Sequence, residues 1–454
     1  MTRVRGMLVA QGVVAWMLAL GAPASPPATA PATTQFVPPY KDLSLSFEQR
    51  VDDLVRRMTL EEKAQQLQMH ARYNARLDIP ACHWWSEGVH GISRAGEATV
   101  YPHAIAMGAT WNVGLIHKIA EQISDEARAK FDPAGVRYRG LTLWCPAADV
   151  VRDPRWGRIQ ETYGEDPHLV GRMAVAFVKG LQGDHPRYLK TVATPKHFAM
   201  HSQETGRTSS SFNVSEATLR DYYLPPFRDC VVEGKAASVM AAHNGINGVP
   251  CHMNRWLLTD LLRGEWGFYG AVVSDINGVQ QLSRGHRAVA SADEAVLAAL
   301  KAGLDVVCNF EPNDASVVAA VRRGAIPEEL LDRAVTRSLL VRYRLGMFDP
   351  PDRVPWTKIG PEVVGRREHV EAALQCARES IVLLQNRPAP PGYGFERLLP
   401  LDPRRVNSVA IVGPYADRLH FGNYSGIPAN PATSPAHGIG AALGPRVRIR
   451  YQRV

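Results

Sequence analysis

Short apolar runs alternate with longer stretches of helical periodicity through most of the chain. Five runs have the length and residue types of buried strands: Leu141–Trp144, Thr191–Thr194, Ala237–Met240, Ala271–Ser274 and Asp305–Val307. Between the runs, apolar positions recur at helical spacing in Leu115–Lys130, Leu169–Leu181, Trp256–Leu262 and Asp293–Lys301. Strand and helix in turn predict a parallel sheet with helical crossovers, and repetition over roughly 300 residues favours closure into a TIM-like (β/α) barrel.

Helical patterns also mark where the barrel begins. The first covers Phe47–Met58, and Thr59 then starts a capping-box sequence, which predicts a second helix directly after the first. We therefore expect the barrel domain to occupy residues 31–348.

A Pro-rich stretch from Asp349 to Pro361 separates two later helical patterns, Pro327–Leu345 and His369–Leu384. It indicates a linker at residues 349–368, followed by a second α/β unit at 369–454. Val409–Gly413 and Arg446–Tyr451 have strand patterns within that unit. Two or three strands make a small domain, so we expect the sequence to end inside it.

The first 30 residues have the order of a secretory signal peptide. Arg3 and Arg5 precede an apolar run from Met7 to Gly21, and small residues follow. The alternative is a membrane anchor, but the run is shorter than the ~20 residues that a spanning helix needs. The sequence therefore predicts a secreted or periplasmic protein with no membrane contact after signal removal, preceded by a Pro- and Ala-rich leader that need not pack.

Composition favours a globular protein and gives no sign of a nucleic-acid partner. Of 454 residues, 45% are hydrophobic and 21% charged, and the formal net charge is +8. The basic residues do not form a stripe but lie beside acids, as in Asp52-Asp53 with Arg56-Arg57. The six cysteines are far apart and have no zinc spacing, so we expect buried free thiols, although export would permit a disulfide. No dinucleotide, P-loop, HExxH or serine-elbow motif occurs, so we expect neither metal nor cofactor.

Polar side chains follow three of the predicted strands at the point where each strand ends. Lys196 and His197 follow one strand, His243 follows the next, and Asp275 comes directly after a third. Barrel enzymes place their chemistry at these ends, so the residues would line one rim. Each also has an ordinary explanation: Asp275 as a helix cap, Lys196 as a surface lysine, His197 as a core histidine.

Two presumed loops combine aromatic rings, charges and glycine. One runs from Asp153 to Asp166, and the other is His83-Trp-Trp-Ser-Glu87 followed by Gly88-Val-His-Gly91. Indole rings suit the C–H faces of sugars, while arginine and carboxylate groups pair with hydroxyls. Internal ion pairs that hold the loop closed are the better explanation for Glu161, Glu165 and Asp166.

These motifs resemble glycoside hydrolase family 3 over the chain from about Leu43 onward. The resemblance is carried by Arg152-Asp-Pro-Arg-Trp-Gly-Arg158, Gln160-Glu-Thr162, Gly164-Glu-Asp-Pro167, Lys196-His-Phe198, Leu262-Arg-Gly-Glu-Trp-Gly-Phe268 and Val272-Val-Ser-Asp275. It implies a TIM-like barrel followed by an αβα sandwich, of which 369–454 would be a truncated part. It also implies a retaining mechanism with Asp275 as the nucleophile. The matching sugar-binding positions are Glu87, Trp144, Arg158, Lys196, His197 and Arg207, with His243 beside the nucleophile where many relatives carry Tyr.

Within the family, the His83–Glu87 segment most resembles the β-xylosidase branch. Glu87 stands where glucosidases usually carry Asp, and its longer side chain would fill the space that a hexose CH2OH group needs. We therefore expect a β-1,4-xylosidase acting on the non-reducing ends of xylo-oligosaccharides. β-Glucosidase and α-L-arabinofuranosidase activity stay open as alternatives.

The resemblance also has gaps that bear on function. The segment Ala199–Arg207 contains no Asp-x-His, which argues against the N-acetylglucosaminidase branch, and Ile276 and Ala147-Ala-Asp149 depart from the usual residues. In this branch the acid/base is a Glu of the second domain, and the matching stretch would lie beyond Val454. We thus expect no acid/base in this chain; Glu87 and Glu204 are conceivable substitutes, but Glu87 is better used on the substrate. The competing reading is a catalytically incomplete sugar-binding fragment; the oligomeric state is not indicated.

Overall fold

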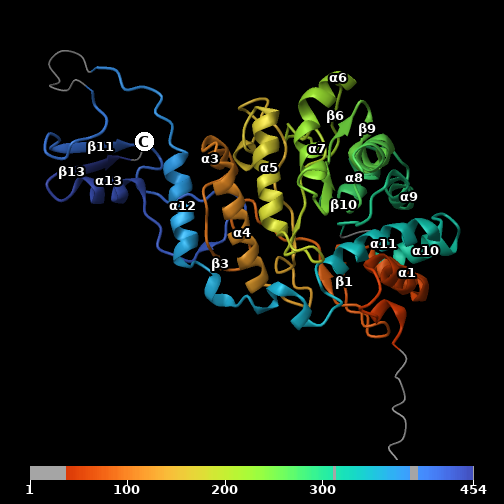
Figure 1. The fold of residues 1–454 in the computed structure, drawn as a ribbon. Coiled ribbons are helices and arrows are strands. Elements are labelled where there is room, and N and C mark those ends of the chain that lie inside the picture. Colours follow the sequence, from red (N-terminus) through yellow and green to blue (C-terminus); the bar gives the residue numbers. More distant parts are fainter. Residues whose placement is uncertain (1–36, 310–312, 389–396, 453–454) are drawn as a thin grey trace, which may run out of the picture. The chain divides into compact units, whose positions relative to one another are not determined.

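Strands and helices alternate along the chain in the computed structural model, which describes residues 37–309, 313–388 and 397–452 (Figure 1). The predicted signal peptide lies outside the described residues. The strands are β1 (His70–Ala71), β2 (Cys82–His83), β3 (Glu97–Ala98), β4 (Thr142–Leu143), β5 (Val192–Ala193), β6 (Ser211–Phe212), β7 (Ser238–Ala241), β8 (Gly245–Ile246), β9 (Val249–Pro250), β10 (Ala271–Ser274), β11 (Ser408–Val412), β12 (Ile427–Pro428) and β13 (Arg448–Gln452).

The helices follow the predicted periodicity closely. They are α1 (Phe47–Arg57), α2 (Leu60–Gln66), α3 (Ala104–Ala109), α4 (Val113–Ala129), α5 (Pro167–Gln182), α6 (Glu216–Thr218), α7 (Pro225–Val232), α8 (Gly278–Arg284), α9 (Ala292–Ala302), α10 (Asp314–Arg322), α11 (Glu328–Arg344), α12 (Arg367–Glu379) and α13 (Pro435–Leu443), with π-helices at Leu219–Tyr223 and Trp256–Glu265. The predicted capping box of α2 is present: the Thr59 side chain accepts from the Glu62 N–H, and the Glu62 carboxylate accepts from the Thr59 N–H. Residues 349–368 hold three short 3-10 turns.

Helix α12 ends at Glu379, five residues before the end of the predicted helical pattern at Leu384. The next residues, Ile381 to Leu384, are apolar but exposed. A helix of this length depends on tertiary packing, and the β-branched side chains of Ile381 and Val382 add little helix propensity of their own. The helix therefore stops where its buried face stops.

Successive strand segments are linked by backbone pairings. The parallel pairings run from Ser86 to Leu143, from β4 to β5, from Phe198 to Ala241, from β7 to β10, and from Val273 through Val306–Val307 to Gln68. The last link joins β1 to β2, with His70 opposite His83. The strand segment Asp305–Val307 is thus confirmed as a pairing partner, although it forms isolated bridges.

The β1–β2 link is antiparallel, which corrects the expectation of an all-parallel sheet. Only residues 72–81 connect the two strands, and no helix lies among them. A parallel crossover needs about a dozen residues or more, so a connection this short permits the antiparallel arrangement alone.

Alternate residues of each strand belong to two different hydrophobic cores. Met240 and Val273 pack with Trp84, Trp144 and Val192 in a cluster drawn from the strands. Their neighbours Val239 and Val272 instead join a larger cluster with helices α4, α5 and α9. This period of two means that the strands are covered on both faces, and polar side chains can approach only at the strand ends.

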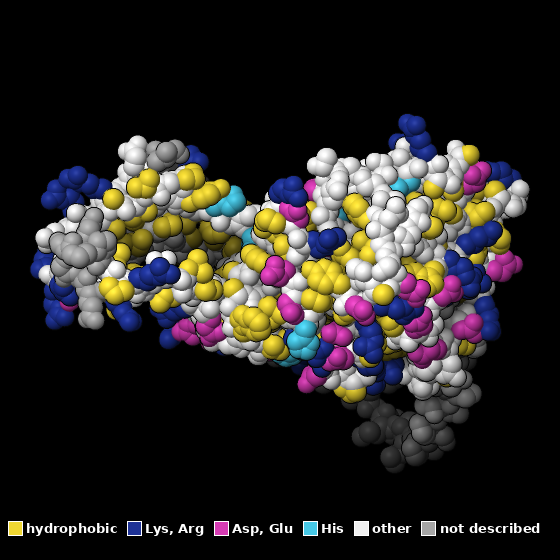
Figure 2. Space-filling model, turned by 90° about the horizontal axis from the view of Figure 1, so that it is seen from above, with side chains coloured by type: hydrophobic (Ala, Val, Ile, Leu, Met, Phe, Trp, Pro, Cys, Tyr) yellow, Lys and Arg dark blue, Asp and Glu magenta, His cyan; other side chains and the backbone are white. Residues whose placement is uncertain are grey.

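The surface carries mixed charge. Figure 2 shows Lys and Arg side chains scattered among Asp and Glu over one face, as the sequence predicts. All six cysteines are buried and have free thiols. Within the described residues, no helix is both long and apolar enough to cross a membrane.

Asp305 connects strand β10, the π-helix Trp256–Glu265 and helix α11, and these contacts give a stability prediction. Its buried carboxylate accepts from the Val272 N–H at 2.8 Å, from Arg263 at 2.5 Å and from Arg337 at 3.0 Å. The variant Asp305→Ala removes the acceptor of the Val272 N–H and the only carboxylate among the described residues that pairs with the largely buried Arg263, so the free energy of unfolding should fall by about 3–5 kcal/mol in urea denaturation. Glu371→Ala, which removes an exposed ion pair with Arg367, should change it little; equal losses would contradict the prediction.

Candidate active site

The ends of the strands bring the predicted polar residues together in one cluster. The cluster is continuous: Glu87 contacts Lys196, and Asp275 contacts both His243 and Arg207. Arg158 and His197 join it through His201, whose ring lies 4.6 Å from that of His197. The structure thus places all eight predicted site residues in one network, including Trp144, which joins through an aromatic stack described below.

Lys196 and Glu87 form a buried ion pair at the centre of this network. Lys196 Nζ lies 3.1 Å from Glu87 Oε2, and each side chain is only 2% exposed. Trp85 Nε1–H donates to the other carboxylate oxygen at 2.9 Å. Burial works against the charge of Lys196, but Glu87 together with Tyr424 and Glu161 outweighs it, so the pKa of the ammonium is raised. Burial raises the pKa of Glu87.

Three aromatic rings enclose this pair. Trp85 stacks on Trp144, with ring centroids 5.5 Å apart and planes 16° from parallel. The ring of Tyr424 lies 4.5 Å from Lys196 Nζ, close enough for a cation–π contact. Tyr424 comes from beyond the predicted linker, and sequence periodicity gave no signal for it. Apolar ring faces next to fixed charges suit a ligand with C–H faces and hydroxyl groups.

The backbone around Tyr424 is held against the loop after β2. His90 contacts the carbonyl oxygen of Asn423 at 3.0 Å, and the Ser93 hydroxyl donates to the carbonyl of Ser425 at 3.2 Å. Strand β12 then pairs in parallel with β3, with Ile427 opposite Glu97. The segment 423–428 is therefore fixed at both ends, and the ring is held over Lys196.

His197 is held by a carboxylate that the sequence analysis did not identify. Asp149 Oδ2 accepts from the His197 backbone N–H at 3.0 Å and lies 2.9 Å from His197 Nδ1. Both residues are fully buried, and burial raises the pKa of Asp149 to about 8 while it lowers the pKa of His197 well below its ordinary value. The one available signal was the position of Asp149 shortly after a strand end.

Arg158 is oriented by Glu161, the residue that the sequence analysis assigned to holding the loop closed. Arg158 Nε and Nη2 donate to the two Glu161 oxygens at 2.8 and 2.7 Å, a bidentate pair. The third nitrogen, Nη1, lies 3.5 Å from His201 Nε2. Burial lowers the pKa of Arg158, but Glu161 outweighs it, so the guanidinium stays charged with one nitrogen directed into the cluster.

Asp275 lies at the end of β10 as predicted, and its two oxygens have different surroundings. Oδ1 accepts from the Ile276 N–H at 2.7 Å, whereas Oδ2 lies 3.3 Å from His243 Nε2 and 3.8 Å from Arg207 Nη1. Its backbone N–H donates to His252 Nε2. Burial raises its pKa, but His243, Arg207 and Arg158 outweigh this, so the pKa of Asp275 is lowered below its usual range and the group is a carboxylate.

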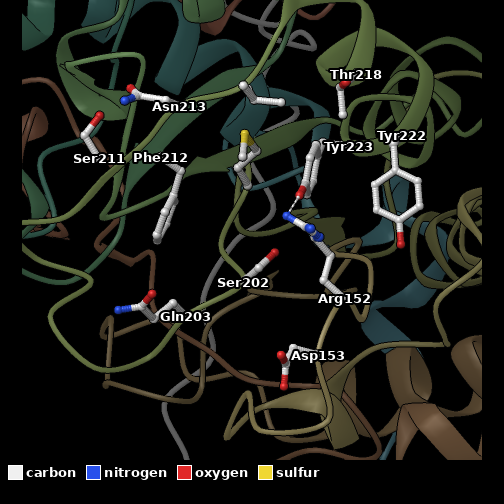
Figure 3. A pocket seen from close by; sticks show the side chains of 12 residues that line it. Arg152, Asp153, Ser202, Gln203, Ser211, Phe212, Asn213, Thr218, Tyr222 and Tyr223 are labelled. Carbon is white, nitrogen blue, oxygen red and sulfur yellow. Dashed lines mark hydrogen bonds between the residues drawn. The ribbon is translucent and has the colours of Figure 1, made fainter.

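A cavity of about 760 Å³ adjoins the cluster through the segment that follows Phe198. Met200 lines it together with Ser202 and Gln203, which Figure 3 shows. His201, between them in the sequence, contacts Arg158 of the cluster. Phe212 and Tyr222 add ring surface to its wall, and Arg152 donates to the Tyr223 hydroxyl at 2.6 Å. Within the described part of the chain, no group of three or more His, Cys, Asp or Glu side chains is arranged to hold a metal.

A buried carboxylate with an arginine and a histidine beside it, near stacked indole rings, lies at the strand ends of an α/β fold, and such a set of groups suits a ligand rich in hydroxyls. Comparison with known proteins agrees: residues 46–341 match the glycosyl hydrolase family 3 N terminal domain. The chain belongs to glycosyl hydrolase family 3.

Individual relatives narrow the comparison. The chain is 39% identical over 420 residues to Beta-D-xylosidase 3 of Arabidopsis thaliana, covering 88% of this chain and 53% of that protein. A solved GH3 exo-beta-xylosidase in complex with a xylobiose aziridine probe matches with a TM-score of 0.81 at 29% identity, over 93% of this chain and 55% of the other. A beta-glucosidase from Erythrobacter marinus matches with a TM-score of 0.78 at 30% identity, over 91% and 59%. The chain spans about half the length of the curated relatives that it matches.

The buried ion pair gives a prediction about stability and pH. In Lys196→Met, Glu87 remains buried without its cation, so the free energy of unfolding should fall by about 3–5 kcal/mol at pH 7. Burial raises the pKa of Glu87 in the folded state, so the folded variant binds a proton more tightly than the unfolded chain. Part of the loss should therefore return between pH 7 and pH 5, as measured by urea denaturation.

Lys301→Met provides the control, because Lys301 is exposed. It should change the free energy of unfolding little at either pH. A loss in Lys196→Met that is small, or that grows as the pH falls, would show that the pair does not have the assigned role.

Proposed function

We propose that this chain carries the nucleophile and most of the sugar-binding residues of a retaining exo-β-glycosidase, a β-1,4-xylosidase acting on xylo-oligosaccharides. The observation that carries the proposal is Asp275: a buried, ionised carboxylate at a strand end, within 4 Å of His243 and Arg207. The similarity to two named β-xylosidases supports the choice of sugar.

The proposed first step needs a carboxylate below the plane of a bound sugar. An oxygen of Asp275 attacks the anomeric carbon, the glycosidic C–O bond breaks, and the leaving oxygen takes a proton from an acid about 5–5.5 Å from the nucleophile. Water then attacks the same carbon and gives a proton to the group that acted as the acid, the ester to Asp275 breaks, and the anomeric configuration is restored. Oδ2, which makes no backbone hydrogen bond, is the oxygen we assign to the attack.

The surrounding groups would bind the sugar rather than react with it. Lys196, His197, Arg158 and Arg207 present donors to hydroxyl groups, Glu87 presents an acceptor, and Trp144 with Trp85 supplies an apolar wall. We assign the acid/base to none of the described carboxylates. Glu87 and Glu161 are engaged with buried cations, and the pKa of Glu204 is lowered.

The finer points of architecture belong to the same proposal. The strand pairings that return from Val307 to Gln68, and from β1 to β2, support a closed TIM-like barrel within residues 31–348. Residues 349–368 would be the linker, and 369–454 would belong to an αβα sandwich. Secretion or export to the periplasm follows from the predicted signal peptide.

The second candidate is β-glucosidase activity, favoured by the Erythrobacter marinus structure. The third is a sugar-binding protein without catalysis, in which the cluster binds a glycoside but Asp275 never reacts. The two experiments below separate these possibilities.

Covalent labelling tests the role of Asp275. A 2-fluoro β-xyloside with a dinitrophenol leaving group needs little acid assistance, so this chain should form a stable xylosyl ester with one equivalent of reagent, located at Asp275 by peptide mass spectrometry. Asp275→Asn should not be labelled. Folded wild-type protein that binds xylobiose yet is never labelled would instead establish the sugar-binding alternative.

Glu87 tests the choice of sugar. We expect labelling by the 2-fluoro xyloside to be about 10- to 200-fold faster than by the 2-fluoro glucoside, the range for one extra group in a close-fitting pocket. Glu87→Asp keeps the charge opposite Lys196 but shortens the side chain, so it should narrow that ratio. Faster labelling of the wild type by the glucoside, or by an activated arabinofuranoside, would replace the xylosidase proposal.

A further inference from the structure

Each cation of the cluster has a carboxylate of its own. Lys196 pairs with Glu87 at 3.1 Å, Arg158 with Glu161 at 2.7 Å, and Arg207 with Glu204 at 3.3 Å. Asp275, in contrast, lies near a cation, Arg207, that is already paired with another acid.

Arg207 lies between two carboxylates but is bound to only one of them. Its Nε lies 3.3 Å from Glu204, while Nη1 points toward Asp275 Oδ2 and stops at 3.8 Å. Nη1 is buried and forms no hydrogen bond with any described residue. A guanidinium held this close to a carboxylate would ordinarily close to hydrogen-bond distance, so a second force keeps it back.

Glu204 is placed to supply that force. Besides Arg207, it contacts His201 Nε2 at 3.1 Å and lies 4.0 Å from Arg158 Nη1. Burial raises its pKa, but the His201 hydrogen bond and the two arginines outweigh this, so the pKa of Glu204 is lowered. It is therefore an anion in contact with a different nitrogen of Arg207 from the one that faces Asp275, and a poor proton donor.

The distance matters because Asp275 loses its charge when it reacts. A hydrogen bond from Arg207 to the carboxylate would be strongest before the reaction and weaker once the ester forms. Such a contact stabilises the ground state more than the transition state and slows the step. A cation held slightly farther away keeps Asp275 ionised without blocking its attacking oxygen.

We propose that Glu204 is a positioning residue that holds Arg207 back from the nucleophile, and so keeps Asp275 both ionised and reactive. The inference rests on the proposed function for its kinetic consequence, but its geometric consequence can be measured without any activity.

Labelling kinetics with the activated 2-fluoro xyloside give the first test. In Glu204→Gln, Arg207 loses its anion and should move onto Asp275, so the labelling rate constant at saturation should fall about 10- to 100-fold while the reagent's dissociation constant changes little. Glu204→Asp keeps the charge, so its labelling rate constant should lie between those of the wild type and Glu204→Gln. The matched control is Glu265→Gln, which removes a carboxylate from the exposed pair with Arg220 and should leave labelling unchanged.

A double-mutant cycle shows whether Glu204 acts through Arg207. If it does, Glu204→Gln should cause no further loss in an Arg207→Gln background. Full additivity would overturn the inference. So would a Glu204→Gln defect that appears only with poor leaving groups, because that is the behaviour of a general acid.

Crystal structures of wild type and Glu204→Gln decide the geometry. The Arg207 Nη1–Asp275 Oδ2 distance, 3.8 Å here, should contract below about 3.2 Å in the variant. An arginine that stays in place or turns away overturns the inference. Failure of wild-type labelling would instead count against the proposed function, and this distance would still decide whether Glu204 restrains Arg207.

Discussion

The buried ion pair of Lys196 and Glu87 is the constraint around which the site is built. An ammonium group with 2% exposure costs several kcal/mol to remove from water unless nearby groups compensate for its lost hydration. Here the compensation comes from three parts of the chain: Glu87 after β2, the Trp85–Trp144 stack that carries the Glu87 hydrogen bond, and the Tyr424 ring. The ends of β2, β4 and β5 and the segment before β12 must therefore meet at one place for the lysine to be buried.

The strand-end residues were predictable because the chain itself carries them at fixed points in the pattern. Lys196, His243 and Asp275 each follow an apolar run of strand length, and parallel strands end on one side of a sheet. Their partners were not predictable in this way. Tyr424 lies at no special point of any periodic pattern, Asp149 lies only in the loop after a predicted strand, and the contacts of both depend on three-dimensional packing. Connection length was the overlooked signal for the antiparallel β1–β2 pair, since residues 72–81 are too few for a crossover.

Three-dimensional packing also explains why the helical pattern after the linker extends beyond the end of α12. Periodicity reports which side chains could form an apolar face, whereas the helix continues only while that face is covered. His369, Ala372 and Cys376 are buried and the helix persists through them; Ile381 to Leu384 are exposed and it does not. Sequence patterns therefore predicted the existence of α12 well and its end poorly.

Pairing each cation with its own carboxylate has a consequence for chemistry in a buried site. In a medium of low polarity, an unpaired guanidinium would be drawn onto the nearest anion, and here that anion is Asp275. Glu161 and Glu204 prevent this by pairing with Arg158 and Arg207, so that the positive charge lowers the pKa of Asp275 from a distance. The arginines thus keep Asp275 ionised without forming a hydrogen bond to the oxygen that attacks. No such bond has to break when the nucleophile reacts.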